Sequence, residues 1–359
     1  MSGLERLVDE RSVLVCAGAG GVGKTTTAAA IALAAARRGR RAAVVTIDPA
    51  RRLANSLGLD GLGNEPTRVA VDGADGELWA LMLDPKRTFD ELVERHAPDA
   101  SARDAVLSNR IYRELSSAVS GSHEYMAMEK LYELHEEGRF DLLVLDTPPS
   151  RSAIDFLESP RRLSRFIDSR SLQFFLAPSR TGLRLTARGT GIAFGLLKRL
   201  TGVDMLQDLS EFFQAFGEMA TGFRDRAHKV DALMADPGTA FVLVTSPRAD
   251  AVDEALWFRR RLAEWSLPFG AVVVNRVHED GTVAGDVVAA AHALLGEKLG
   301  HKVARNFEDY RRLAERDRAS VSRLEAELSG APLVRVPWFD EDVHDLDGLT
   351  GMGARLGLG

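Results

Sequence analysis

One glycine-rich segment near the N-terminus combines a lysine and a threonine in a spacing suited to phosphate chemistry. Gly18-Ala19-Gly20-Gly21-Val22-Gly23-Lys24-Thr25 fits the pattern G-x-x-x-x-G-K-[ST]. Its glycines let backbone N–H groups turn toward phosphate oxygens, where side chains would block them. The lysine brings positive charge to the β- and γ-phosphates, and the threonine hydroxyl ligates Mg²⁺. The predicted binding residues for ATP are Gly20, Gly21, Val22, Gly23, Lys24, Thr25 and Thr26.

Two aspartates, Asp48 and Asp146, each follow an apolar run that predicts a buried strand. The carboxyl ends of parallel strands form the edge where open α/β sheets bind ligands. Asp48 is expected to orient or partly deprotonate the attacking water, although a helix N-cap is its alternative role. Asp146 has the Walker B position, in which a carboxylate holds the Mg²⁺ shell. Lys24 and Asp48 are therefore the predicted catalytic residues, and Thr25, Asp48 and Asp146 the predicted metal site.

The elements that must position these residues alternate between short β-branched runs and longer helical stretches. This alternation predicts an α/β fold of the P-loop NTPase kind, with a mostly parallel, doubly wound sheet. Residues 1–359 are expected to form a single domain with a helical subdomain inserted in two pieces, at about 84–140 and 151–236. Residues Gly58 to Gly76 are expected to form a surface loop. The expected strands are Ser12 to Ala17, Ala42 to Ile47, Trp79 to Leu83, Leu142 to Asp146, Ala240 to Thr245, Ala271 to Asn275 and Leu333 to Val336.

The composition of the 359 residues is that of a soluble globular protein, with 27% charged residues and a net charge of -6. We expect no integral membrane segment and no secretion signal, and hence a cytoplasmic protein. The mild acidity argues against nucleic acid as a partner. The single cysteine, Cys16, excludes an internal disulfide and any cysteine-pair metal site.

Three segments together resemble the ArsA-type ATPases, and the resemblance covers nearly the whole chain. They are the P-loop with Gly-Gly-Val-Gly-Lys-Thr-Thr, then Asp48-Pro49-Ala50, then Asp146-Thr147-Pro148-Pro149. This family has a deviant Walker A P-loop and includes the arsenical pump ATPase and the ATPase that guides tail-anchored membrane proteins. The resemblance implies a Mg²⁺-dependent, dimeric ATPase whose nucleotide state controls the helical subdomain. It also implies that Asn275 contacts adenine and that Pro337 lies in a loop on the other side of that base.

The chromosome- and plasmid-partitioning ATPases are the rival relatives, because they share the deviant P-loop and an Asp-x-Pro-Pro segment. They carry Asp-Pro-Gln where this chain has Asp48-Pro49-Ala50, and the large helical insertion also favours the ArsA-type branch. A partitioning-type ATPase on DNA stays an alternative. Salt-dependent retention on DNA would support it.

Ala19 is the main departure from the resembled family. That family places a lysine there, which reaches across the dimer to the partner's phosphates, so this chain resembles a subgroup that lacks the upstream lysine. Either another side chain, such as Arg51, Arg52 or Arg151, replaces the lysine in a homodimer, or the chain pairs with a lysine-bearing paralogue. In the second case it could be a nucleotide-binding subunit that hydrolyses ATP weakly when alone. Thiolate binding of arsenite, and zinc at a dimer interface, are excluded by the single cysteine.

The stretch between Asp168 and Asp204 has no acidic residue and alternates basic with apolar side chains. By resemblance it could bind a hydrophobic client segment, or lie on an anionic membrane surface. The alternative is that its side chains pack inside the subdomain or against a second subunit. Its basic and large apolar residues are Arg170, Phe174, Phe175, Leu176, Arg180, Leu183, Arg184, Arg188, Ile192, Phe194, Leu196, Leu197, Lys198 and Arg199.

Overall fold

The computed structural model describes residues 3–47, 52–110, 112–113, 122–148, 150–168, 203–279, 287–328 and 330–359. The chain divides into two units. Unit 1 comprises Met1–Met82, Glu137–Ala153 and Ala235–Gly359, and unit 2 comprises Leu83–Glu136 and Ile154–Met234.

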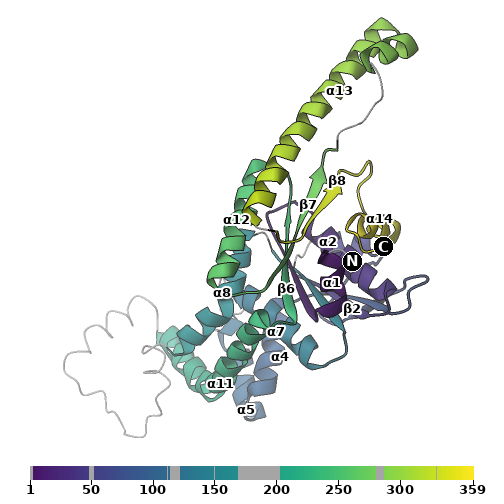
Figure 1. Cartoon of the computed structure of the whole chain (residues 1–359). Coiled ribbons are helices and arrows are strands. Elements are labelled where there is room, and N and C mark those ends of the chain that lie inside the picture. The colour runs from purple at the N-terminus through teal and green to yellow at the C-terminus, as the bar shows by residue number, and fades with distance from the viewer. Residues whose placement is uncertain are drawn as a thin grey trace, which may run out of the picture. The chain divides into compact units, whose positions relative to one another are not determined.

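Unit 1 is built on an eight-stranded sheet with the strand order β3-β4-β2-β5-β1-β6-β7-β8 (Figure 1). Every neighbouring pair is parallel except β3 with β4. This arrangement confirms the predicted α/β fold with a mostly parallel sheet. The strands are β1 (Val13–Ala17), β2 (Arg41–Thr46), β3 (Thr67–Val69), β4 (Glu77–Met82), β5 (Leu142–Asp146), β6 (Thr239–Thr245), β7 (Phe269–Val277) and β8 (Leu333–Pro337).

The segment from Gly58 to Gly76 is not only a surface loop, and that part of the prediction was wrong. It contains β3, which pairs antiparallel with β4 through Arg68 opposite Trp79. Only Val69 of this strand is buried, so the apolar alternation that identifies a strand in a sequence is too short to be recognised there.

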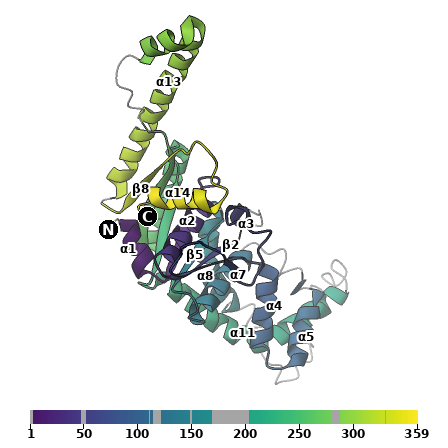
Figure 2. The same ribbon diagram turned by 90° about the vertical axis from the view of Figure 1, so that its right-hand side faces the viewer.

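Helices cover both faces of the sheet. The helices are α1 (Gly3–Glu10), α2 (Lys24–Arg37), α3 (Arg52–Ser56), α4 (Pro85–His96), α5 (Ala100–Ser108), α7 (Ser122–Glu136), α8 (Ser150–Ile167), α11 (Val203–Ala235), α12 (Ala249–Glu264), α13 (Val287–Leu328) and α14 (Leu346–Arg355). On one face, α2 contacts α1, α3 and α14 as well as strands of the sheet, and on the other face α12 packs on β6 and β7 (Figure 2).

Helix α2 is buried on nearly all sides because it lies between the sheet and other helices. Its small residues allow close packing: Ala28, Ala29, Ala32, Ala35 and Ala36 are each inaccessible to solvent. This packing holds the first turn of α2, which begins at Lys24, rigidly against the edge of the sheet. The residues predicted to bind phosphate are therefore held in a fixed position.

Helix α13 has 42 residues with non-helical backbone angles at Gly296. Its C-terminal half packs against α12 and β7, with Val321, Leu324 and Leu328 buried. Its N-terminal half extends away from the sheet (Figure 1) and exposes Leu294.

The secondary-structure elements that the structure describes in unit 2 are all helices, joined by short non-helical segments. Its core brings together aromatic and aliphatic side chains of α4, α7 and α11, including Leu92, Met126, Phe216 and Phe223. A buried ion pair joins Arg226 Nε on α11 to Glu129 Oε1 on α7 at 2.5 Å. The basic and apolar stretch between Asp168 and Asp204 lies almost entirely outside the described residues, including all of its basic and large apolar residues named above.

Candidate active site

The P-loop turns from β1 into α2 through a glycine that no other residue can replace without strain. Gly23 has a φ of 96°, in the region that favours glycine. A Cβ atom on Gly23 would lie 2.3 Å from Asn275 Nδ2. That amide donates a hydrogen bond to the carbonyl oxygen of Val22 at 2.9 Å. Position 23 is therefore restricted by its backbone conformation and by the approach of β7.

Two hydroxyl groups meet one carboxylate at the carboxyl ends of β2 and β5. Thr25 Oγ1 donates to Asp146 Oδ2 at 2.6 Å, and Thr46 Oγ1 donates to the same oxygen at 2.9 Å. The strand register explains the meeting, because Asp146 pairs with Thr46 on one side and with Cys16 on the other. Asp146 is buried. The structure thus joins two residues of the predicted metal site and adds Thr46, which the sequence marks only as a threonine at a strand end.

Lys24 is buried, and its Nζ donates to the carbonyl oxygen of Ala19 at 2.8 Å. The ammonium group is therefore held within the P-loop. Burial, reinforced by the nearby Asp146 carboxylate, raises the pKa of the Cys16 thiol far above its usual range. Cys16 is consequently a neutral core side chain rather than a nucleophile.

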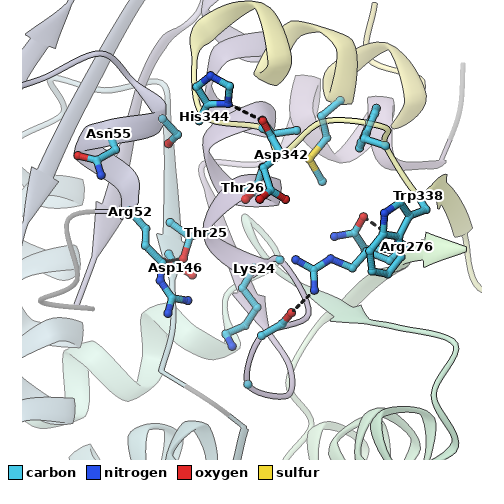
Figure 3. Close-up of a pocket in the computed structure, with 18 of the residues that line it drawn as sticks. Lys24, Thr25, Thr26, Arg52, Asn55, Asp146, Arg276, Trp338, Asp342 and His344 are labelled. Atoms are coloured by element: carbon cyan, nitrogen blue, oxygen red, sulfur yellow. Dashed lines mark hydrogen bonds between the residues drawn. The ribbon is translucent and has the colours of Figure 1, made fainter.

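A cavity of about 910 Å³ in unit 1 opens beside these groups (Figure 3). Most of the predicted nucleotide-binding residues line it, whereas Val22 and Pro337 do not. Asp48 lies outside the described residues. The predicted residues that line the cavity are Gly20, Gly21, Gly23, Lys24, Thr25, Thr26, Asp146 and Asn275.

The far end of the cavity has an aromatic and cationic wall that the sequence did not reveal. Trp338 is 55% exposed and lines the cavity, although Pro337 beside it does not. The guanidinium carbon of Arg276 lies 5.5 Å from the centre of the Trp338 ring. The ring of His278 also stacks on Trp338 at 5.5 Å, and its Nδ1 lies 2.6 Å from Asp317 Oδ2. Sequence adjacency to Asn275 and Pro337 was the only available signal for Arg276 and Trp338.

Helix α3 supplies another wall of the cavity through Arg52, Asn55 and Ser56. The segment after β8 contributes Glu341, Asp342 and His344. Neither set was predicted as part of the site, because both come from positions without a recognisable motif. The sequence indicates Arg52 only as one of three possible replacements for the lysine absent at Ala19.

A mostly parallel sheet with a P-loop after β1, an aspartate ending β5 and a large cavity at the same edge defines a P-loop nucleotide-hydrolysing protein. The chain belongs to the anion-transporting ATPase family, whose sequence profile matches residues 11–335. It is an ATPase of the ArsA type, as the sequence predicted.

Relatives with related names are similar to this chain over most of its length. It is 26% identical to ATPase GET3C of Arabidopsis thaliana, with 96% of this chain and 82% of the relative covered. It is 24% identical to the putative arsenical pump-driving ATPase 1 of Aquifex aeolicus, with 96% and 78% covered. The identity to ATPase GET3 of Podospora anserina is 24%, with 76% of each chain covered.

No helix in the described part of the chain is long and apolar enough to cross a membrane. No group of three or more His, Cys, Asp and Glu side chains in that part of the chain could hold a metal ion.

Proposed function

We propose that this chain is a Mg²⁺-dependent ATPase that works as a dimeric switch. The meeting of Thr25 and Thr46 on Asp146 beside the buried Lys24 carries the proposal. Such a corner needs little covalent chemistry from the protein, because phosphoryl transfer depends mainly on positioning and on charge stabilisation.

The side chains at the corner fit Mg²⁺ by their chemistry. Thr25 and Asp146 present hard oxygen donors 2.6 Å apart, and Mg²⁺ prefers oxygen ligands, commonly one or two protein groups together with phosphate and water. Thr25 and Asp146 would hold the ion, with Asp48 as the further predicted ligand. Bound there, Mg²⁺ would neutralise charge on the β- and γ-phosphates.

Lys24 would bind the β- and γ-phosphates after exchanging its hydrogen bond with the Ala19 carbonyl oxygen for phosphate oxygens. The exchange replaces a neutral acceptor by a charged one, which strengthens the hydrogen bond. Gly20, Gly21 and Gly23 would let backbone N–H groups reach the same phosphates. We assign the orientation of the attacking water to Asp48, as its place after β2 suggests.

The base would bind at the far end of the cavity. Asn275 lines that end, and its amide is held by the Val22 carbonyl oxygen and by the backbone N–H of Arg276. Trp338 offers a partly exposed aromatic ring for stacking, which the neighbouring Pro337 does not. We therefore assign base recognition to Asn275 together with the segment that follows Pro337.

The partner and the client are further parts of the proposal, and they rest on the family resemblance. A dimer would let nucleotide state change the helical unit 2, which by resemblance could handle a hydrophobic client or partner. A heterodimer with a lysine-bearing paralogue is the alternative assembly, because Ala19 lacks the lysine.

The experiment is ATP binding by Lys24→Ala, measured with a fluorescent ATP analogue. We expect a large loss of affinity, because the substitution removes a charge-assisted contact with phosphate. Lys86→Ala is the matched control, since Lys86 is half-exposed on α4 and pairs with Asp90. Equal ATP affinity of Lys24→Ala and the wild type would refute the assignment of the site.

A further inference from the structure

Among the described residues, one lysine and two arginines line the cavity, and they differ in what they already contact. Lys24 donates to the Ala19 carbonyl oxygen at 2.8 Å. Arg276 Nη1 donates to the carbonyl oxygen of Gly21 at 3.0 Å, and its guanidinium group lies by Trp338. Arg52 has neither a hydrogen bond nor an ion pair with any residue that the structure describes. Its charge is thus available to a ligand without breaking a contact of that kind.

The backbone of Arg52 is nevertheless held in place. Arg52 begins α3, and the next residue, Leu53, is 1% exposed in the core shared with α2. Leu57, one turn later, is also buried. Residues four apart lie on the same face of a helical turn, so Leu53 and Leu57 fix the side that faces the core. Arg52 and Asn55, three residues apart, both face the cavity.

The Arg52 side chain extends toward Thr25 and Asp146, where the phosphates of ATP would bind. Figure 3 shows it running past Thr25 and Asp146, from the side of the cavity opposite Arg276 and Trp338. Lys24 lies on the P-loop side of these residues, with its Nζ held by the Ala19 carbonyl oxygen. A γ-phosphate bound by Lys24 would therefore have Arg52 as a second basic side chain on another side.

We propose that the Arg52 guanidinium binds the γ-phosphate of ATP and supplies, within the same chain, the positive charge that Ala19 cannot supply. This inference rests on the proposed function. Water oxygen forms a bond to the γ-phosphorus, the bond to the β,γ-bridging oxygen breaks, and its electron pair leaves with ADP. The water proton ends on the released phosphate or in solvent. Arg52 takes no proton, and its two N–H groups can bind two of the three γ-oxygens as their charge is redistributed.

Arg276 does not fit this role. It holds the P-loop from the Gly21 side and also lines a second cavity of about 390 Å³ with Ala19 and Trp338. Its guanidinium group is thus already engaged by the Gly21 carbonyl oxygen and by the Trp338 ring, whereas that of Arg52 is not.

The test compares Arg52→Ala, Arg52→Lys and the control Arg37→Ala in the full-length chain. Arg37 is exposed in the last turn of α2, at the end away from the P-loop. For Arg52→Ala we expect kcat to fall by about 10³-fold or more, the lower part of the range for an arginine finger. The Kd for ATP should change far less, because the guanidinium acts mainly on the transition state. Arg52→Lys should retain part of kcat, and Arg37→Ala all of it.

Chemical rescue provides a readout that a merely structural role would not give. Added guanidinium ion at millimolar concentration should raise kcat of Arg52→Ala and leave Lys24→Ala inactive. The melting temperature of Arg52→Ala should equal that of the wild type, because the side chain is exposed. Unchanged kcat in Arg52→Ala, or loss of turnover without rescue, would overturn the inference.

The outcome also separates this inference from the proposed function and from the heterodimer. If Lys24→Ala loses ATP binding while Arg52→Ala turns over normally, the ATP site stands and the role of Arg52 is wrong. If the purified wild type binds ATP but turns over only with a lysine-bearing paralogue, the cation comes from the partner and Arg52 is again excluded. If Lys24→Ala binds ATP as the wild type does, the ATP site itself fails.

Discussion

Replacing Gly23 by alanine tests how closely β7 approaches the P-loop. The methyl group would be forced into a left-handed backbone conformation, which costs roughly 1–2 kcal/mol. It would also lie 2.3 Å from Asn275 Nδ2 and displace the amide that donates to Val22. A buried amide left without its acceptor adds roughly 1–3 kcal/mol. We therefore expect Gly23→Ala to lower the free energy of unfolding of unit 1 by roughly 2–5 kcal/mol.

Gly21→Ala is the matched control, because it measures only the cost of placing alanine in a left-handed backbone conformation. Gly21 also has a left-handed φ, 74°, but nothing lies within 4 Å of the position of its Cβ. Gly21→Ala should lower the free energy of unfolding by only about 1 kcal/mol, because alanine also restricts the unfolded chain and so offsets part of the backbone cost. The difference between the two variants isolates the contact with Asn275.

Tryptophan fluorescence during urea unfolding measures this difference in unit 1 only. The chain has four tryptophans, and all of them, Trp79, Trp257, Trp265 and Trp338, belong to unit 1. In an Asn275→Ala background the amide that would contact the new methyl group is absent. Gly23→Ala should then lower the free energy of unfolding no more than Gly21→Ala does. Equal losses for Gly21→Ala and Gly23→Ala in the wild-type background, or full additivity with Asn275→Ala, would refute the reasoning.

Three further predictions concern separate groups. Asp48→Asn should bind ATP but turn over slowly in a steady-state phosphate-release assay, because an amide cannot accept the water proton; normal turnover would make Asp48 only a helix cap. The raised thiol pKa of Cys16 means that above about pH 8.5 the unfolded chain loses a proton that the folded chain keeps. The free energy of unfolding should then fall by about 1.4 kcal/mol per pH unit relative to Cys16→Ala, and parallel pH profiles would contradict this. Arg226→Met leaves Glu129, 1% exposed, without its cation and should destabilise unit 2 by roughly 3–5 kcal/mol in thermal unfolding followed by circular dichroism. Arg224→Met, whose contact with Asp168 is exposed, should lose less than about 1 kcal/mol, and similar losses for both would argue against the buried pair.

Most of the sheet could be predicted because buried parallel strands are apolar throughout. The predicted bounds of β5, Leu142 to Asp146, agree with the structure at both ends, since an apolar run there stops at an acid. Strand β7 is longer than predicted, Phe269–Val277 rather than Ala271 to Asn275, because pairing with β6 and β8 continues past Gly270 and Arg276, which interrupt the apolar run. Pairing partners are a property of the folded sheet and leave little trace in the strand itself.

Helix α13 was not predicted. Its C-terminal half buries Val321, Leu324 and Leu328, but its N-terminal half exposes apolar residues such as Leu294 that interrupt a simple two-faced pattern. The glycine at position 296 further breaks the helical signal. A helix that leaves the sheet for half its length is only partly specified by burial.

The residues of the site also differ in whether the sequence could predict them. The P-loop and Asp146 could be predicted because their function depends on local spacing within one segment. Thr46 reaches Asp146 through the register of β2 with β5, and Trp338 reaches the base end through β8. Such residues are brought to the site by tertiary pairing, so no spacing in the sequence identifies them.

The arginines considered for the charge absent at Ala19 show what the structure adds to such a motif. Arg51, Arg52 and Arg151 are candidates because they lie near the two aspartates in the sequence. Spacing alone does not distinguish which of them could replace the lysine. Burial of Leu53 and Leu57 fixes the orientation of α3, and that orientation directs Arg52 to the cavity. A charge absent from the P-loop can thus be restored from a neighbouring helix, provided that the helix is anchored by apolar residues on its opposite face. Hydrophobic side chains that never meet the nucleotide therefore decide which cation can reach it.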